Sequence, residues 1–186
     1  LAPLFKELNL VPLHFCGEDL CNNQGPMVSP DFLRTSYFPT VRMIIEPLLD
    51  AGVCLIHHCD GDVRPVVDDF LALGFGGLQG FQYELGVDLS ALAAKRTPNN
   101  TPLLFFAGMS VTRTLPFGTV DDVRREVRYC YDATAGGRGM FLFTANVTGV
   151  EVSVENIRAG YAAARALRPG VTPVSPPYPW PGLTLA

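Results

Sequence analysis

The feature that most constrains this 186-residue chain is a fivefold alternation of short apolar runs with segments of helical periodicity. Each run has the length and composition of a buried strand, and no hairpin signal separates it from the next. Strands that alternate with helices predict parallel pairing through right-handed crossovers. The sequence therefore predicts an α/β protein with parallel strands, expected at residues 11–17, 53–58, 76–81, 101–107 and 140–145.

Local helix-start signals support this alternation. Ser29 stands before a proline and an aspartate, the order typical of a capped helix N-terminus. Thr119 and Asp122 approximate a capping box, and Ser153 precedes the last helical segment. Residues 169–186 hold six prolines, so an extended surface tail is expected there.

Two architectures suit such a chain: an open doubly wound sheet, or part of a (β/α)₈ barrel. A complete barrel has eight βα units and typically about 250 residues. Five units are counted here, so the periodicity by itself leaves both architectures open.

Composition excludes several classes of protein. A net charge of −4 and a pI near 5.3 give no basic surface for nucleic acid. No apolar run approaches the roughly 20 residues that span a bilayer. The five cysteines are an odd number without the density of a disulfide-stapled module, so reduced thiols and a cytoplasmic location are expected.

Polar residues gather where the predicted strands end. The run at 53–62 (VCLIHHCDGD) finishes in His58 and Asp60, and parallel sheets bind their ligands at the carboxyl ends of strands. His57 should point to the opposite face, as a structural histidine. The other candidates follow the neighbouring strands: Glu18, Asp19, Gln79 and Gln82. Solvent-exposed loop positions are the alternative for these four.

Several segments, taken together, resemble the C-terminal part of the uroporphyrinogen decarboxylase superfamily. They are GEDLCNNQGPMVSPDFL at 17–33, LIHHCDGDVRPVVDDFLALG at 55–74, LQGFQYELGVDL at 78–89, FAGMSVTRTLPFGTVDDVRREV at 106–127 and VSVENIRAGYAAA at 152–164. The superfamily contains the haem-pathway decarboxylase and corrinoid-linked methyltransferases. The resemblance implies that residues 1–168 form about the last five βα units of a partial (β/α)₈ TIM barrel.

The methyltransferase branch holds zinc with one histidine and two cysteines. The resemblance matches His58 to that histidine and Asp60 and Asn146 to the two cysteine positions. A nitrogen and oxygen site of His58 and Asp60, with Glu18 or Asp19 as a further candidate ligand, would still suit zinc or a harder ion. The alternative is that His58 and Asp60 hydrogen-bond an organic substrate or act as an acid and base pair.

The segment at 17–30 and the His-x-Asp-Gly order look closer to the methyltransferases. The resemblance therefore implies transfer of a methyl group from a small substrate to a corrinoid protein. His58, Asp60 and Glu18 are the candidate catalytic residues, and the candidate substrate-binding residues are Asp19, Gln79, Gln82 and Asn146. The alternatives are a decarboxylase of a tetrapyrrole-type or other acidic substrate, and a non-catalytic part-barrel subunit.

The N-terminal units of the barrel have no counterpart in this sequence, which begins at Leu1. Three explanations are open: the chain is a fragment of a longer product, the remaining units come from another polypeptide, or the chain is a degenerate relative of the superfamily. A part-barrel exposes strand edges and an apolar face, so a second chain or self-association is expected to cover them.

Overall fold

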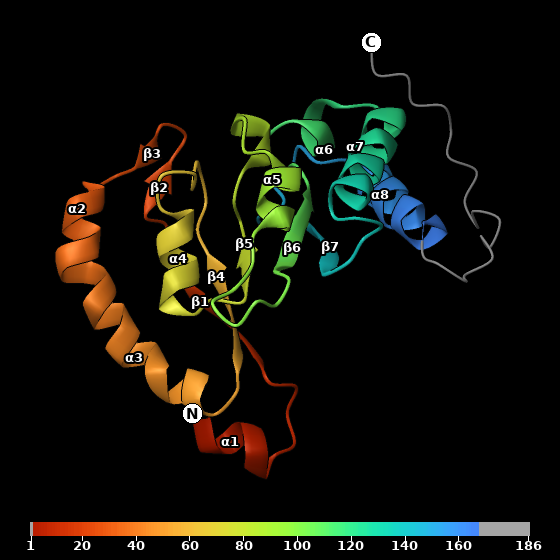
Figure 1. The fold of residues 1–186 in the computed structure, drawn as a ribbon. Coiled ribbons are helices and arrows are strands. Elements are labelled where there is room, and N and C mark those ends of the chain that lie inside the picture. Colours follow the sequence, from red (N-terminus) through yellow and green to blue (C-terminus); the bar gives the residue numbers. More distant parts are fainter. Residues whose placement is uncertain (1, 168–186) are drawn as a thin grey trace. The chain divides into compact units, whose positions relative to one another are not determined.

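The computed structural model describes residues 2–167, which form an α/β fold built on parallel strands (Figure 1). The strand order is β1-β4-β5-β6-β7, and the pairs β1–β4, β4–β5 and β6–β7 are parallel. The predicted fold class is confirmed; the tail predicted at 169–186 lies outside the described residues. The strands are β1 (Leu13–Gly17), β2 (Cys21–Asn22), β3 (Gly25–Pro26), β4 (Cys54–His58), β5 (Gly77–Gln79), β6 (Leu104–Met109) and β7 (Met140–Thr144).

Helices connect the parallel strands, and none within residues 2–167 has both the length and the apolar character to cross a bilayer. The α-helices are α1 (Ala2–Glu7), α2 (Pro30–Phe32), α3 (Phe38–Asp50), α4 (Val67–Leu73), α5 (Leu89–Ala94), α6 (Thr114–Phe117), α7 (Val120–Ala133) and α8 (Val154–Ala166). A π-helical turn, η1 (Leu33–Tyr37), joins α2 to α3, and a 3₁₀ turn, η2 (Tyr83–Leu85), precedes α5.

The predicted helix starts are confirmed. The Ser29 hydroxyl accepts the N–H of Phe32 at 3.1 Å, and Ser153 caps α8 in the same way. At α7, Thr119 accepts the N–H of Asp122, whose carboxylate accepts the N–H of Thr119 at 2.7 Å. Each cap satisfies amide groups that a helix cannot pair within itself.

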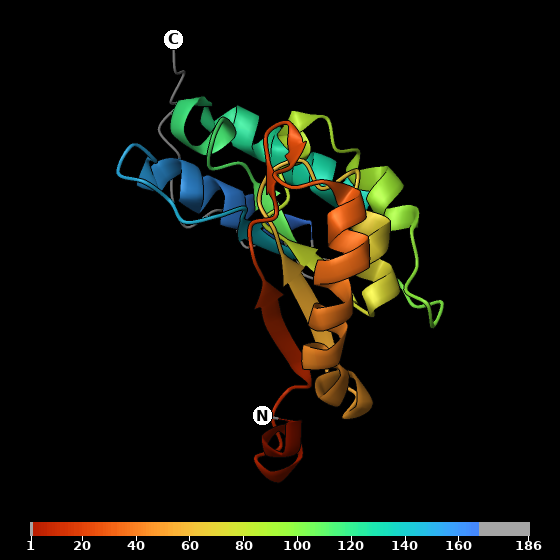
Figure 2. The same cartoon turned by 90° about the vertical axis from the view of Figure 1, so that its left-hand side faces the viewer.

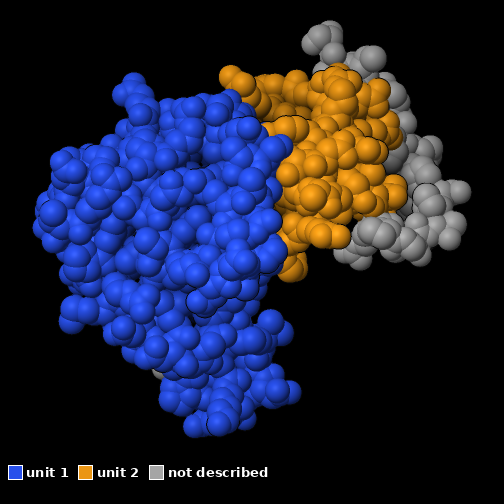
Figure 3. All heavy atoms as spheres, in the orientation of Figure 1, with its two compact units in different colours: residues 1–104 blue, residues 105–186 orange. Residues whose placement is uncertain are grey.

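The chain divides into two compact units, residues 1–104 and residues 105–186 (Figure 3). In the first, α3 and α4 lie side by side along one face of β1 and β4 (Figure 2). The His57 ring stacks on Phe70 of α4, with centroids 3.9 Å apart. Because side chains alternate along a strand, His58 faces away from these helices.

Strand register brings three strand ends of the first unit together. Gly17 of β1 pairs with His58 of β4, which pairs with Gln79 of β5. These are the last residues of their strands, so the loops that follow all leave from one edge. The residues immediately after them are the ones that can surround His58.

The second unit has its own apolar core between α7, α8 and the end of β6. Met109, Val123 and Ala159 are among its fully buried members. The amide of Asn156, at the start of α8, donates to the carbonyls of Leu115 and Gly118 at 2.9 Å each. These bonds tie α8 to the short helix α6.

The chain after β1 contains a hairpin that the alternation of strands and helices does not predict. The segment forms a small antiparallel hairpin in which Cys21 pairs with Pro26 and Asn22 with Gly25. Asn22 Oδ1 accepts the N–H of Gln24 at 2.8 Å, and Gly25 adopts a φ of +117° that suits glycine. The hairpin follows β1 directly and so stands next to the strand ends.

Candidate functional site

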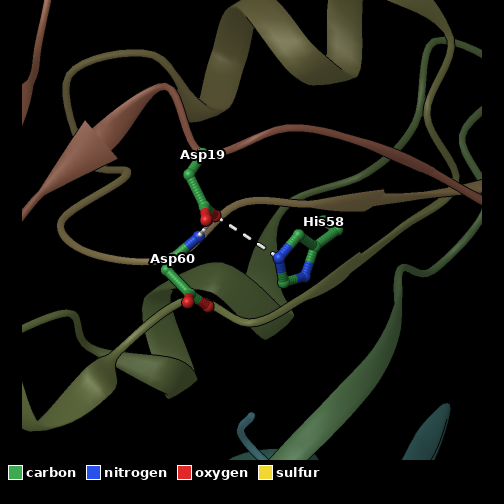
Figure 4. Close-up of side chains that lie close together, drawn as sticks. All are labelled: Asp19, His58 and Asp60. Atoms are coloured by element: carbon green, nitrogen blue, oxygen red, sulfur yellow. Dashed lines mark hydrogen bonds and ion pairs between the residues drawn. The ribbon is translucent and has the colours of Figure 1, made fainter. Parts of the chain in front are cut away.

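His58 is the centre of the candidate site, and both nitrogens of its ring have polar neighbours. Nδ1 is hydrogen-bonded to Oε1 of Gln79, the next residue across the sheet. Nε2 lies 3.3 Å from Oδ1 of Asp19, two residues beyond β1 (Figure 4). The His58 side chain is 29% exposed, so a ligand can reach it from solvent.

Asp60 completes a group of three potential ligands. Its backbone N–H donates to Oδ1 of Asp19 at 2.9 Å, which fixes that carboxylate beside His58. One ligand atom from each of Asp19, His58 and Asp60 lies within 4.8 Å of the others. Candidates that the sequence placed after two different strands therefore meet at one point (Figure 4).

Gln79 determines which ring nitrogen of His58 is available to a ligand. An amide oxygen can only accept a hydrogen bond, so the proton lies on Nδ1 of His58. The other ring nitrogen, Nε2, lies toward Asp19. Because Gln79 is buried and already bonded to His58, it positions the histidine rather than contacting solvent.

Gly80 shapes the site through the side chain that it lacks, and sequence reasoning missed it. A Cβ on Gly80 would come within 2.7 Å of Asp60 Oδ1 and 2.9 Å of His58 Nδ1. The backbone of Gly80, with φ of +90°, therefore lies close against Asp60 and the Nδ1 side of the His58 ring. The signal in the sequence for this role was that Gly80 directly follows Gln79, the polar residue that ends β5.

The loop after β4 is held by Gln82. Its Oε1 accepts the N–H of Gly61 at 3.1 Å, and its own N–H donates to the Gly61 carbonyl at 3.2 Å. Asp62 then accepts from the backbone and guanidinium of Arg64, and this hydrogen bonding lowers the pKa of its carboxyl. Gln82 thus supports the site instead of entering it.

His57 is a core histidine, as the strand alternation predicted. Its ring stacks on Phe70 and meets the edge of Phe75 at 4.5 Å. Burial lowers the pKa of His57 to about 4. The side chain is therefore neutral near pH 7 and has no direct part in the site.

Two other candidates lie outside the three-residue group. Glu18 is exposed, and partial burial of its carboxyl raises its pKa. Asn146 follows β7 in the second unit, where its Oδ1 accepts the N–H of Val147 at 2.6 Å. The structure brings together Asp19, His58 and Asp60, with Gln79 behind the ring.

The donor set fits a divalent cation. Two ligands about 2.0–2.1 Å from a tetrahedral ion stand about 3.3 Å apart, which is the separation of His58 Nε2 and Asp19 Oδ1. Nε2 and the carboxylate oxygen beside it can also share a cation or a proton between them. These residues form a polar cluster at the carboxyl end of parallel strands and are the candidate ligand site.

No family model and no curated protein matches the chain. Among solved structures, the chain is similar to a methyltransferase from Methanosarcina mazei, with a TM-score of 0.58 and 19% identity. The match covers 82% of this chain and 41% of the methyltransferase. The chain therefore has a methyltransferase-like fold and spans less than half the length of that protein.

Proposed function

We propose that this chain is part of a uroporphyrinogen decarboxylase-like barrel that passes a methyl group from a small methylated substrate to a corrinoid protein. The observation that carries the proposal is the convergence of Asp19, His58 and Asp60 at the strand ends. This edge is where parallel α/β folds bind their ligands. The similarity of the fold to that of a methyltransferase agrees with this choice of reaction.

Zinc or another divalent ion is the proposed cofactor, held by His58 Nε2 and by carboxylate oxygens of Asp19 and Asp60. Bound there, it would act as a Lewis acid on the leaving group of the methyl donor. The resemblance places thiolates at the positions of Asp60 and Asn146, so oxygen groups replace sulfur there, and a harder ion than zinc also suits the site.

Gln79 and Gly80 position the side chains of this centre. Gln79 holds the proton on Nδ1 of His58 and so keeps Nε2 as the ligating or proton-accepting atom. Gly80 lets its backbone pack closely against His58 and Asp60, where a Cβ would come within 3 Å of both side chains, and so helps to hold them in place. Without an ion, a proton on Nε2 held by Asp19 would serve as a general acid for the leaving group.

A polycarboxylate substrate fits this centre less well. Asp19 and Asp60 place two carboxylates beside His58, and these would repel an acidic substrate. Decarboxylation of a tetrapyrrole-type substrate is therefore the weaker alternative.

Each unit also has apolar side chains that a complete barrel would enclose. Phe15 of β1, on the same face as His58, is 43% exposed. In the second unit, Phe141 and Phe143 of β7 are 49% and 47% exposed, and Phe141 stacks on Phe106 of β6. We infer that further βα units, or a second copy of the chain, cover these faces.

Native mass spectrometry tests this inference. The expected result is an assembly heavier than the 20.2 kDa of the single chain. A stable species at the mass of one chain would contradict it.

Methyl transfer to cob(I)alamin tests the proposed activity. The chain, in its native assembly, is mixed with small methylated donors, and methylcobalamin is followed by its absorbance. His58→Ala should abolish the transfer. His14→Ala is the matched control, since His14 packs on Phe5 away from the site and its loss should leave the rate unchanged. Equal rates for the chain and His58→Ala would exclude the proposed role.

A further inference from the structure

A pocket of about 490 Å³ lies in the second unit, between α7, β7 and α8. Apolar side chains from all three elements line it, among them Val127 of α7, Leu142 of β7 and Ala164 of α8. Tyr131 and Tyr161 add two aromatic side chains to its walls. Its volume is within the range of pockets that enclose whole small molecules, so it can hold a bulky aromatic side chain.

The chain leaves α8 beside this pocket. Leu167 is the C-cap of α8 and also one of the residues that line the pocket. The next 19 residues, 168–186, lie outside the part of the chain that the structure describes. The sequence that follows Leu167 therefore starts at the pocket itself.

Residues 169–186 have the composition of a segment that binds an apolar groove. They include six prolines and no charged residue, and they place Tyr178 and Trp180 between prolines. Proline-rich segments lose little conformational entropy on binding, and they dock on grooves lined by aromatic side chains. Solvated linkers, in contrast, are typically polar and charged.

The spacing allows these aromatic residues to return to the pocket. Trp180 lies 13 residues after Leu167, and a chain of that length can extend to about 45 Å. The lining residues Tyr161 and Leu167 are six positions apart, which is about 9 Å along a helix. The intervening chain is therefore long enough to reverse direction and reach every wall of the pocket.

We propose that the pocket between α7, β7 and α8 binds residues 178–180 of this chain, with the indole of Trp180 inserted among the apolar side chains. Arg165 also lines the pocket, and a guanidinium is attracted to the face of an indole ring. The proposal goes beyond methyl transfer and does not depend on it, because the candidate metal ligands are in the first unit.

The chain's own segment is a better occupant than the same segment of a second copy. A short tether gives the segment an effective concentration in the millimolar range at its own pocket. A segment of another molecule would have to compete with that concentration.

The fluorescence of Trp180 tests the proposal, since this is the one tryptophan of the sequence. In the full chain, the emission should lie at a shorter wavelength than that of N-acetyl-tryptophanamide in the same buffer, and acrylamide should quench it less. Emission and quenching equal to those of the free amide would overturn the proposal.

Two tyrosine variants test where Trp180 binds. Tyr161 and Tyr129 are 38% and 40% exposed on neighbouring helices, but of the two only Tyr161 lines the pocket. Tyr161→Ala should shift the emission toward that of the free amide and increase quenching, whereas the matched control Tyr129→Ala should change neither. Equal spectra for the two variants would overturn the assignment to this pocket.

Arg165→Ala keeps the test decisive if circular dichroism shows that Tyr161→Ala is unfolded. The side chain of Arg165 is exposed, so its loss should leave the unit folded. Removal of the guanidinium should shift the emission in the same direction by a smaller amount. An unchanged spectrum would overturn the contact between Arg165 and Trp180.

Dilution distinguishes the chain's own segment from that of a second copy. The emission of Trp180 should stay constant across a dilution that dissociates any oligomer seen by native mass spectrometry. A shift toward the free amide on dissociation would show that the segment comes from another molecule, and would overturn binding within one chain.

Discussion

The ends of β4 and β6 both carry polar residues, but only one of them is arranged as a site. After β6, the carboxylate of Glu126 accepts the N–H of Ser110 at 3.2 Å and the hydroxyl of Thr114 at 3.1 Å. The Ser110 hydroxyl accepts the N–H of Arg113 at 3.1 Å. These groups build the turn into α6, and Ser110 is 1% exposed.

At the end of β4, side chains from two loops converge instead. Nε2 of His58 and the carboxylates of Asp19 and Asp60 converge, with the His58 side chain 29% exposed. The comparison teaches that a polar residue after a strand is weak evidence for function. At the end of β6 the carboxylate of Glu126 accepts from groups of its own turn, whereas at the end of β4 side chains from two different loops converge on a partly exposed histidine. Substitutions at the two strand ends should therefore have different effects.

The largest expected effect is on the pH dependence of stability, and it comes from His57, the buried neighbour of His58. Its pKa is about 4 when folded and about 6.5 when unfolded, so below pH 6.5 the unfolded chain binds more protons. The free energy of unfolding should therefore fall by about 3 kcal/mol between pH 6.5 and 4 because of His57 alone. Denaturant titrations across that range measure it.

His57→Leu removes the titrating ring and is the comparison for that experiment. Its unfolding free energy should depend less on pH over the same interval. The same acid sensitivity in both chains would show that His57 is not buried as described.

Glu126 should matter for stability and not for ligand binding. Glu126→Ala deprives the buried N–H of Ser110 of an acceptor, which should cost about 1–3 kcal/mol in unfolding free energy. Glu126→Gln keeps an acceptor oxygen and should cost less. A loss of divalent-ion affinity in Glu126→Gln would contradict the assignment of a purely structural role to the end of β6.

Gln79 should affect the affinity of the site for the metal ion. Gln79→Leu removes the acceptor for Nδ1–H of His58, and the loss of such a partner typically lowers metal affinity by about 10–100-fold. Gln79→Glu preserves an acceptor and is the matched control, with affinity retained. Calorimetric titration with zinc gives both values, and equal affinity in Gln79→Leu would remove the positioning role.

Asp19 should have the smallest effect on stability. Its side chain is 53% exposed, and partly exposed ion pairs contribute less than about 1 kcal/mol. Asp19→Asn should therefore unfold at nearly the denaturant concentration of the parent chain, yet bind zinc more weakly. A large loss of stability would class Asp19 with Glu126 as a structural residue.

Features encoded by neighbouring residues could be predicted from the sequence. The caps at Ser29, Thr119 and Ser153 depend on side chains within three residues of each helix start. The parallel strands follow from apolar runs alternating with helices. The hairpin at residues 21–26 was missed because strands of two residues carry no periodicity.

Features that depend on the approach of distant segments could not be predicted. His58 and Asp60 were found because they end a strand, but the choice of Asp19 over Glu18 depends on how the chain leaves β1. Gly80 has its role only because its backbone lies close against His58.

Zinc titration of the chain and of His58→Ala tests the central claim most directly, with circular dichroism to verify that both are folded. We expect the chain to bind one ion and His58→Ala to lose that binding, because Nε2 of His58 is the nitrogen ligand of the proposed centre. Equal binding by the two chains, or none by either, would contradict a metal centre at the end of β4.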